Sequence, residues 1–160
     1  MPVAATEKLP LIILGKAPVM GKKGVNARDD WPGCEVWTVG TARIADADRY
    51  YEFHGLECPN RNVYRTVSAD IKRVFGLLLP FNNSICAMIM EAYLEGYRNI
   101  RIAGCPMTTK AEYIEQARAV AMCVGFIRGL AYGQPHRRLR ISWDEEPKKE
   151  FYYEVHQPGY

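Results

Sequence analysis

Short apolar runs, each followed by glycine or by polar residues, recur through the first half of this chain. The segment 11–14 is entirely aliphatic and stops at Gly15, and the segment 35–39 is followed by Gly40. Runs of this length and character are typical of strands that are buried on both faces of a parallel sheet. The sequence therefore predicts strands at residues 11–14, 35–39, 50–54 and 62–67, and a short helical turn at 25–30.

The second half of the chain carries two helical patterns. Ser84 is a good N-cap for a helix over residues 85–95, which Gly96 ends. A capping box at residues 109–112 opens a second helix, which ends near Gly129. Apolar residues recur at helical spacing in both, namely Ile85, Met88, Ile89 and Ala92 in the first and Ile114, Ala117, Ala121 and Val124 in the second.

The segment between the two helices completes a recognisable order of elements. Residues 99–103 form an expected strand that closes at Gly104, and residues 139–142 form a last one. Helix, strand, glycine loop and helix in this order are typical of a right-handed parallel crossover. The apolar segment 75–81 contains glycine and proline, which indicates a packed loop or a short helical turn. The predicted fold is α/β, with a single open, mostly parallel Rossmann-like sheet flanked by helices.

Composition places the chain among globular proteins of one domain. Its 160 residues are 48% hydrophobic and 24% charged, which supplies enough apolar surface for a core. We expect a Rossmann-like ligand-binding domain over residues 1–144 and a C-terminal tail over 145–160 that packs on the domain or docks a partner. The formal charge of +3 is too small to make nucleic acid the expected partner.

The cysteines and the N-terminal residues bear on cofactors and location. No two of the five cysteines form a Cys-x-x-Cys pair, and the three histidines share no ligand spacing, so no metal and no cofactor is expected. Free thiols fit a reducing compartment. Residues 1–10 do not resemble a signal peptide, and no apolar run approaches the ~20 residues that cross a bilayer. The expected location is the cytoplasm, without membrane contact.

Ligands of open α/β sheets bind where the carboxyl ends of the strands meet. Two of the expected strand-end loops lead into a helix N-terminus, whose free N–H groups and dipole favour anions. The loop 15–24 is rich in glycine and lysine but fits neither standard phosphate-binding fingerprint, so a purely structural tight turn is an equal alternative. The residues expected to bind a ligand at the strand ends are Gly15, Lys16, Gly40, Thr41, Asn83, Ser84, Gly104, Met107 and Thr108.

Arg49 and His54 complete the candidate ligand-binding set. Arg49 can grip a phosphate bidentately. His54 shares a strand face with Glu52 if residues 50–54 are extended, which suits a ligand contact or a general acid–base group; a buried structural histidine is the alternative. Ser84 lacks the elbow sequence of a nucleophile and is better explained as an N-cap. Cys105 precedes a helix that would activate its thiol, although a bystander role is better supported.

Five segments of the chain carry a pattern shared with known proteins. They are Leu-Gly-Lys-Ala-Pro at 14–18, Trp-Thr-Val-Gly-Thr at 37–41, Asp-Arg-x-x-Glu-x-His at 48–54, a serine-led helix ending in Gly-Tyr at 84–97, and Gly-x-x-Met at 104–107 before Glu112-Tyr113. Together these segments resemble a family of small phage-encoded Rossmann-like proteins. More remotely, they are similar to the nucleotide-binding halves of bacterial sialyltransferases and archaeal pterin diphosphokinases.

Two departures from that family pattern bear on whether the ligand is only bound or is also turned over. The turn at 40–42 lacks the family's asparagine, and Pro106 stands where the family has an aspartate that could bind a ribose hydroxyl or a metal. The resemblance therefore implies a phage-type protein that binds a nucleotide-derived small molecule and does not turn it over. Sequestration of a host defence signal is our hypothesis for its role.

Two other classes of function stay open. One is an enzyme, either a nucleotide-sugar or phosphoryl transferase or a nucleotide hydrolase that uses His54. The other is a structural or interaction protein whose aromatic tail docks a partner. The sequence also leaves a homo-oligomer open.

Overall fold

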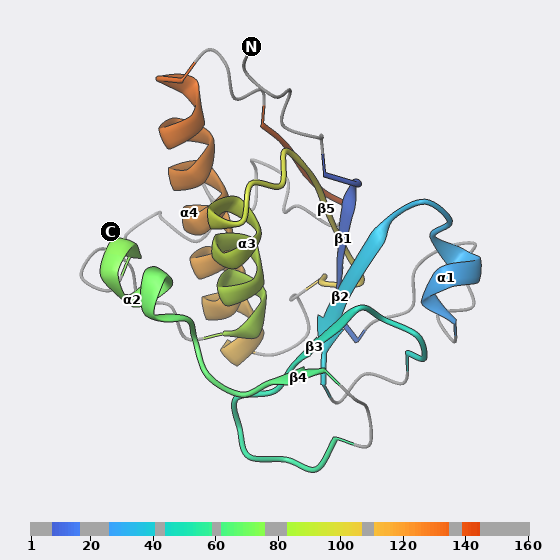
Figure 1. Ribbon diagram of the computed structural model, residues 1–160. Coiled ribbons are helices and arrows are strands. Elements are labelled where there is room, and N and C mark those ends of the chain that lie inside the picture. The colour runs from blue at the N-terminus through green and yellow to red at the C-terminus, as the bar shows by residue number, and fades with distance from the viewer. Residues whose placement is uncertain are drawn as a thin grey trace.

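The computed structural model describes residues 8–16, 26–40, 44–58, 62–75, 83–106, 111–134 and 139–144. They form one open sheet of six strands, all parallel, in the order β4-β3-β2-β1-β5-β6 (Figure 1). The expected α/β sheet is thereby confirmed. Its strands are β1 (Leu11–Leu14), β2 (Glu35–Val39), β3 (Arg49–Tyr51), β4 (Val63–Tyr64), β5 (Asn99–Ala103) and β6 (Arg140–Trp143).

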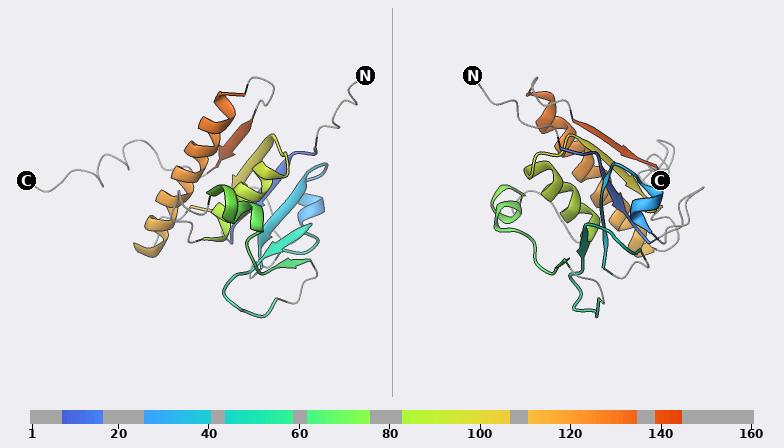
Figure 2. Two further views of the ribbon diagram at one scale, coloured as in Figure 1. Left: turned by 60° about the vertical axis from the view of Figure 1, so that its left-hand side comes forward. Right: turned by 45° about the vertical axis from the view of Figure 1, so that its right-hand side comes forward.

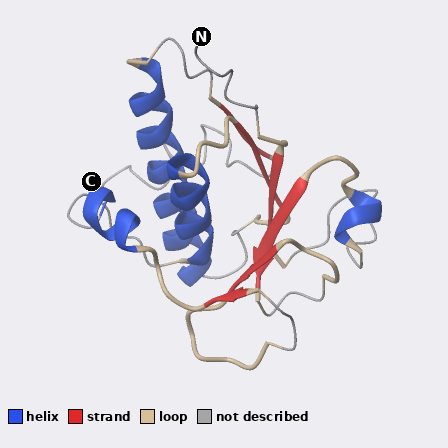
Figure 3. Cartoon of the chain, in the orientation of Figure 1, coloured by secondary structure: helices blue, strands red, loops and turns tan. Residues whose placement is uncertain are grey.

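Helices lie on both faces of the sheet. The short α1 (Ala27–Asp30) is on one face, and α2 (Ala69–Phe75), α3 (Ser84–Leu94) and α4 (Ala111–Tyr132) are on the other (Figure 3). The longer helices α3 and α4 run side by side in both views of Figure 2, and both begin at the carboxyl ends of the strands. None of the described helices is both long and apolar enough to cross a bilayer.

The apolar character of β1 follows from its central position in the sheet. Side chains alternate between the two faces of a strand. Leu11 and Ile13 enter the core under α3 and α4, whereas Ile12 and Leu14 enter a second core that includes residues of α1. A central parallel strand with both faces covered has no place for polar residues, which is why the run 11–14 is continuous rather than alternating.

The outer strands β5 and β6 alternate because only one of their faces is covered by the described helices. Ile100, Ile102, Ile141 and Trp143 are buried under α3 and α4. On the opposite face, the exposed Arg101 of β5 makes a bidentate hydrogen bond to Asp144, with N···O distances of 2.7 and 2.9 Å. Among the described helices, both faces are therefore covered at the centre of the sheet and one face at this end.

Strands β1, β2 and β5 agree with the sequence prediction at both ends and β6 is shifted by one residue, but the middle of the chain differs more. The expected strand 50–54 is only Arg49–Tyr51, and 62–67 is only Val63–Tyr64. The helix α2 was missed, because Ile71 is the only buried residue among its described side chains and gives no helical period. Helix α2 includes Phe75, the first residue of the segment 75–81 that was expected to be a loop or a short helical turn. Residues 76–81 lie outside the described residues.

Helix ends also differ in detail from the prediction. Asn83, not Ser84, is the N-cap of α3: its Oδ1 accepts a hydrogen bond from the backbone N–H of Cys86 at 2.9 Å. Both residue types cap helices well, so the sequence alone did not separate them. Helix α4 continues through Gly129 to Tyr132, and Thr109 and Lys110 of its expected capping box lie outside the described residues. Residues 145–160 also lie outside them.

Candidate functional site

The glycine at the end of β1 is fixed by the loop that follows β5. The backbone N–H of Gly15 donates to Ala103 O at 2.9 Å. A Cβ atom at position 15 would lie 2.2 Å from the carbonyl oxygen of Gly104, and Gly104 itself has a positive φ of 68°. The two loops therefore touch through their backbones, and Gly15 serves this close approach. The contacts therefore support a structural role for Gly15 rather than a role in phosphate binding.

The residue after Gly104 is also engaged inside the fold. Cys105 is buried, with 4% of its surface exposed. Its thiol donates to Ala103 O, and its own carbonyl accepts a hydrogen bond from the indole N–H of Trp143 at 3.0 Å. A thiol held in this way is not presented to a ligand, so the bystander role of Cys105 is the better explanation.

A second close contact joins the ends of β2 and β3. A Cβ atom at Gly40 would lie 2.7 Å from Cβ of Glu52, so these residues pack too closely for any larger residue at position 40. The thiol of Cys58 donates to Gly40 O at 3.1 Å. The loop after β3 thus folds back onto the end of β2, and this arrangement positions residues 53–58 at the carboxyl edge of the sheet.

The carboxylate of Glu52 organises that loop from within. Its side chain is 2% exposed, and its oxygens accept hydrogen bonds from the backbone N–H groups of His54 and Leu56, each at 2.9 Å, and from Arg65 Nη1 at 3.0 Å. Burial acts to raise the pKa of Glu52, but these donors and the charge of Arg65 outweigh it and lower the pKa. Glu52 is therefore a buried anion that holds the loop.

The structure corrects the expected relation between Glu52 and His54. The strand ends at Tyr51, so the two side chains do not alternate along one strand face. Glu52 binds the backbone of His54 rather than its ring, and His54 is exposed. Within the described part of the chain no carboxylate is hydrogen-bonded to that imidazole. The described contacts therefore do not form the carboxylate-oriented histidine that a shared strand face would have suited.

The N-terminus of α3 reaches the same edge of the sheet. The amide nitrogen of Asn83 is buried and has no hydrogen-bond partner among the described residues, while its oxygen caps the helix. Ser84 is the first helical residue. The carboxyl edge of the sheet therefore gathers Gly15, Lys16, Gly40, His54, Asn83, Ser84 and Gly104, whereas the candidate residues Thr41, Met107 and Thr108 lie outside the described residues.

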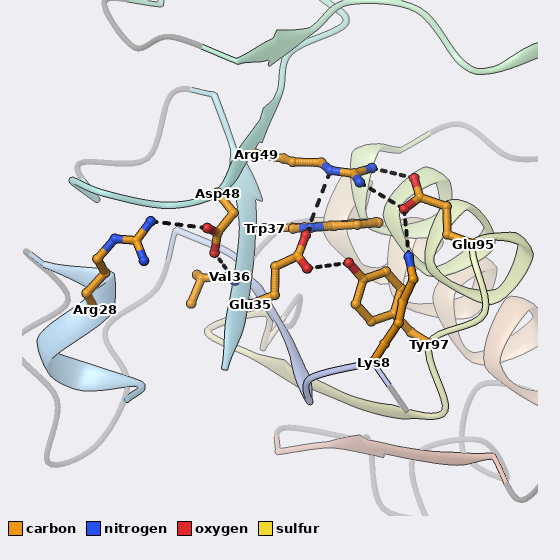
Figure 4. Close-up of polar contacts among 9 residues, drawn as sticks. All are labelled: Lys8, Arg28, Glu35, Val36, Trp37, Asp48, Arg49, Glu95 and Tyr97. Carbon is orange, nitrogen blue, oxygen red and sulfur yellow. Dashed lines mark hydrogen bonds and ion pairs between the residues drawn. The ribbon is translucent and has the colours of Figure 1, made fainter. Parts of the chain in front are cut away.

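Arg49 is set apart from those residues, at the opposite edge of the sheet. It is the first residue of β3, and its guanidinium donates to both carboxylate oxygens of Glu95, the residue that follows the last turn of α3 (Figure 4). The guanidinium also lies over the rings of Trp37 and Tyr64, with 4.2 and 5.2 Å to the ring centroids. Arg49, which the sequence analysis assigned to a ligand phosphate, therefore joins β3 to the end of α3.

Further groups complete this amino-edge cluster. Glu35 accepts a hydrogen bond from Tyr97 and another from the indole N–H of Trp37, the latter at 2.8 Å. Lys8 pairs with Glu95 and lies over the ring of Tyr97. Burial acts to raise the pKa of Glu95, but Arg49 and Lys8 outweigh it and lower the pKa. Burial and the hydrogen bond to Glu35 raise the pKa of Tyr97.

The block Asp-Arg-x-x-Glu-x-His at 48–54, the most specific part of the family resemblance, is largely structural here. Asp48 accepts a hydrogen bond from the backbone N–H of Val36 at 2.8 Å and pairs with Arg28 (Figure 4). Arg49 binds Glu95, and Glu52 binds the loop. His54 is the exposed residue of the block whose ring makes no described hydrogen bond or ion pair.

The described residues of the carboxyl edge form none of the donor sets that hold metal ions. Among the described residues, no three His, Cys, Asp or Glu side chains are grouped to hold a metal ion. Sequence reasoning missed Glu52 as a buried anchor, and it missed Leu56 and Arg65 altogether. No local signal marks them, because the contacts that define their roles arise only when the loop folds back.

Comparison with known proteins adds no assignment: no family model, no curated protein and no solved structure matches the chain.

Proposed function

We propose that this protein binds a small phosphate-bearing molecule of nucleotide type at the carboxyl edge of its sheet and does not turn it over. The observation that carries the proposal is the strand order. The chain runs from β1 outward to β4 and then crosses back to β5 on the other side of β1. Open parallel sheets bind ligands at such a reversal, outside the carboxyl ends of the strands.

Charge and helix direction at this edge favour an anionic ligand. Lys16 lies two residues after the end of β1 and is exposed. Helix α3 begins at the same edge, where its first N–H groups and its dipole favour negative charge. Gly15 and Gly104 pack against each other, so the proposed phosphate contacts are Lys16 and the first turn of α3. His54 is proposed to hydrogen-bond to another part of the ligand.

The hydrogen bonding of Glu52 favours binding over turnover. General acid–base catalysis needs a side chain that can exchange a proton with the ligand. At the carboxyl edge, the carboxylate of Glu52 is buried and already accepts three hydrogen bonds. A role in sequestering a nucleotide-derived host defence signal is consistent with this, and it rests on the resemblance to phage-encoded proteins.

Mass spectrometry of small molecules released when the purified protein is denatured tests the proposal. We expect a nucleotide-derived mass to be recovered from the wild type and to be lost or reduced in Lys16→Ala, because a charge-assisted bond to phosphate is worth about 10- to 100-fold in affinity. The recovered compound should be unchanged after prolonged incubation with fresh protein. Conversion of the compound by the wild type, abolished in a folded His54→Ala variant, would establish an enzyme instead.

A further inference from the structure

The loop after β3 has a shape that is set without any ligand. Three donors converge on the buried carboxylate of Glu52, and two of them are the backbone N–H groups of His54 and Leu56. A carboxylate that is 2% exposed persists in a fold only when its oxygens are paired. Any displacement of the loop would leave this charge unpaired, so the backbone of 54–56 is held in place.

The loop is also closed at its far end. Arg65 Nη1 bridges Glu52 and the carbonyl oxygen of Leu56, the latter at 3.0 Å. Cys58 bonds to the carbonyl of Gly40. Gly55, between His54 and Leu56, takes a positive φ of 74°, which lets the chain reverse. Residues 53–58 therefore form a short arm with both ends tied to the sheet.

The arm presents a polar and an apolar group at the edge where the ligand is proposed to bind. His54 is exposed, and Leu56 is 50% exposed although it is a large aliphatic residue. Figure 2 shows the teal loop after β3 projecting beyond the ends of the strands. Strand β2 separates β3 from β1 in the sheet, so the ends of β3, which leads into the arm, and of β1, which leads to Lys16, are about 10 Å apart, two strand spacings.

We infer that this arm, residues 53–58, contacts the part of the ligand that carries no phosphate. Leu56 covers a flat apolar group such as a nucleobase, His54 hydrogen-bonds to the same moiety, and the phosphate lies at Lys16. A nucleoside phosphate spans such a separation. Glu52 is the positioning residue, which acts through the backbone of His54 and Leu56. The inference rests on the proposed function and adds the orientation of the ligand to it.

Calorimetry with matched variants separates the inference from the proposed function. The probes are ADP, GDP, CDP and UDP, and inorganic phosphate serves as the probe without a base. We expect Leu56→Ser to weaken the best nucleotide about fivefold, because it removes apolar contact area, and to leave phosphate binding unchanged. Leu9→Ser is the control: Leu9 is 59% exposed and lies ahead of β1, at the other edge, so nucleotide affinity should not change. Lys16→Gln should weaken nucleotide and phosphate alike.

The outcomes are distinct. If none of the four nucleotides binds the wild type, the proposed function is wrong. If a nucleotide binds and Leu56→Ser matches Leu9→Ser, only the inference about the arm is wrong. A loss of inorganic phosphate binding in Leu56→Ser equal to the loss of nucleotide binding would also overturn it, since the arm would then act on the phosphate.

The positioning role of Glu52 needs a readout that a purely structural role would not move. In Glu52→Gln we expect faster amide hydrogen exchange at His54 and Leu56, together with weaker binding of the nucleotide and unchanged binding of inorganic phosphate. Faster exchange with unchanged nucleotide affinity would show that the arm is ordered but does not touch the ligand. If Glu52→Gln does not fold, Arg65→Gln removes one donor from the half-exposed side of the network and gives the same two measurements.

Discussion

Replacement of Arg49 by alanine should cost far more stability than the loss of an ordinary surface ion pair. The side chains of Arg49 and Glu95 are 19% and 27% exposed, and Arg49 makes a bidentate hydrogen bond to Glu95 while lying over Trp37. The hydrogen bonds to Glu95 raise the pKa of Arg49 against the opposing effect of burial. The guanidinium is thus stabilised in its charged form by the fold.

The size of the effect follows from where this pair lies between two limits. Removal of one partner of a fully buried pair costs about 3–5 kcal/mol, and an exposed pair contributes about 0–1 kcal/mol. The cation–π contact with Trp37 adds about 0.5–1 kcal/mol. For a pair that is mostly but not fully buried, we expect Arg49→Ala to lower the free energy of unfolding by about 2–3 kcal/mol. Arg49→Lys should lose roughly half as much, because it keeps the charge but not the planar fork.

Urea unfolding followed by tryptophan fluorescence measures this difference, since Trp37 is fully buried beside the guanidinium. The matched control is Arg73→Ala. Arg73 pairs with Asp70 on α2, but the two side chains are 77% and 68% exposed, so its loss should cost under about 0.5 kcal/mol. If Arg49→Ala is no more destabilising than Arg73→Ala, the amino-edge cluster does not hold β3 to α3 and our account of Arg49 is wrong. Nucleotide affinity should be unchanged in Arg49→Ala.

Three further predictions concern other parts of the fold. Gly15→Ala should destabilise by about 3 kcal/mol in thermal or urea unfolding, because its Cβ would lie 2.2 Å from a backbone oxygen, whereas Gly125→Ala on the open face of α4 should stabilise by about 0.5–1 kcal/mol. Folding lowers the pKa of Glu95, so the contribution of this carboxylate to the free energy of unfolding is present above pH 4.5 and is lost as the pH falls through the folded-state pKa. The free energy of unfolding should therefore fall less steeply with acid in Glu95→Gln than in the wild type. An identical slope would contradict the ion pair. Arg128 donates to Ile141 O at 2.6 Å on β6, the last strand of the described sheet, so light scattering should detect more self-association in Arg128→Ala than in the wild type.

The centre of the sheet was predictable because its constraint is local and strong. β1, β2 and β5 agree with the sequence prediction at both ends, since a strand covered on both faces, or a strictly alternating one, leaves a pattern within five residues. The third strand was overextended to His54. The aromatic residues of 50–54 favour a strand. The chain leaves the sheet after Tyr51 because the backbone N–H groups of His54 and Leu56 bind the carboxylate of Glu52 instead of a neighbouring strand.

The roles of the charged residues could not be predicted from local sequence. Arg49 is an attractive phosphate ligand in isolation, yet its partner Glu95 is 46 residues away and becomes its neighbour only when α3 packs across the sheet. The glycines were ambiguous for the same reason. Gly15 is compatible with phosphate binding or with a close backbone approach, and only the position of Gly104 separates the two explanations.

The measurement that tests the central claim most directly is a ¹⁵N NMR titration of the full chain with the nucleoside diphosphate that binds best. The account expects amide shifts at Lys16, His54, Leu56 and Ser84, all at the carboxyl edge, and none at Glu95 or at the other groups of the amino-edge cluster. Shifts confined to the amino edge, or no saturable shift with any of the four nucleotides, would contradict it.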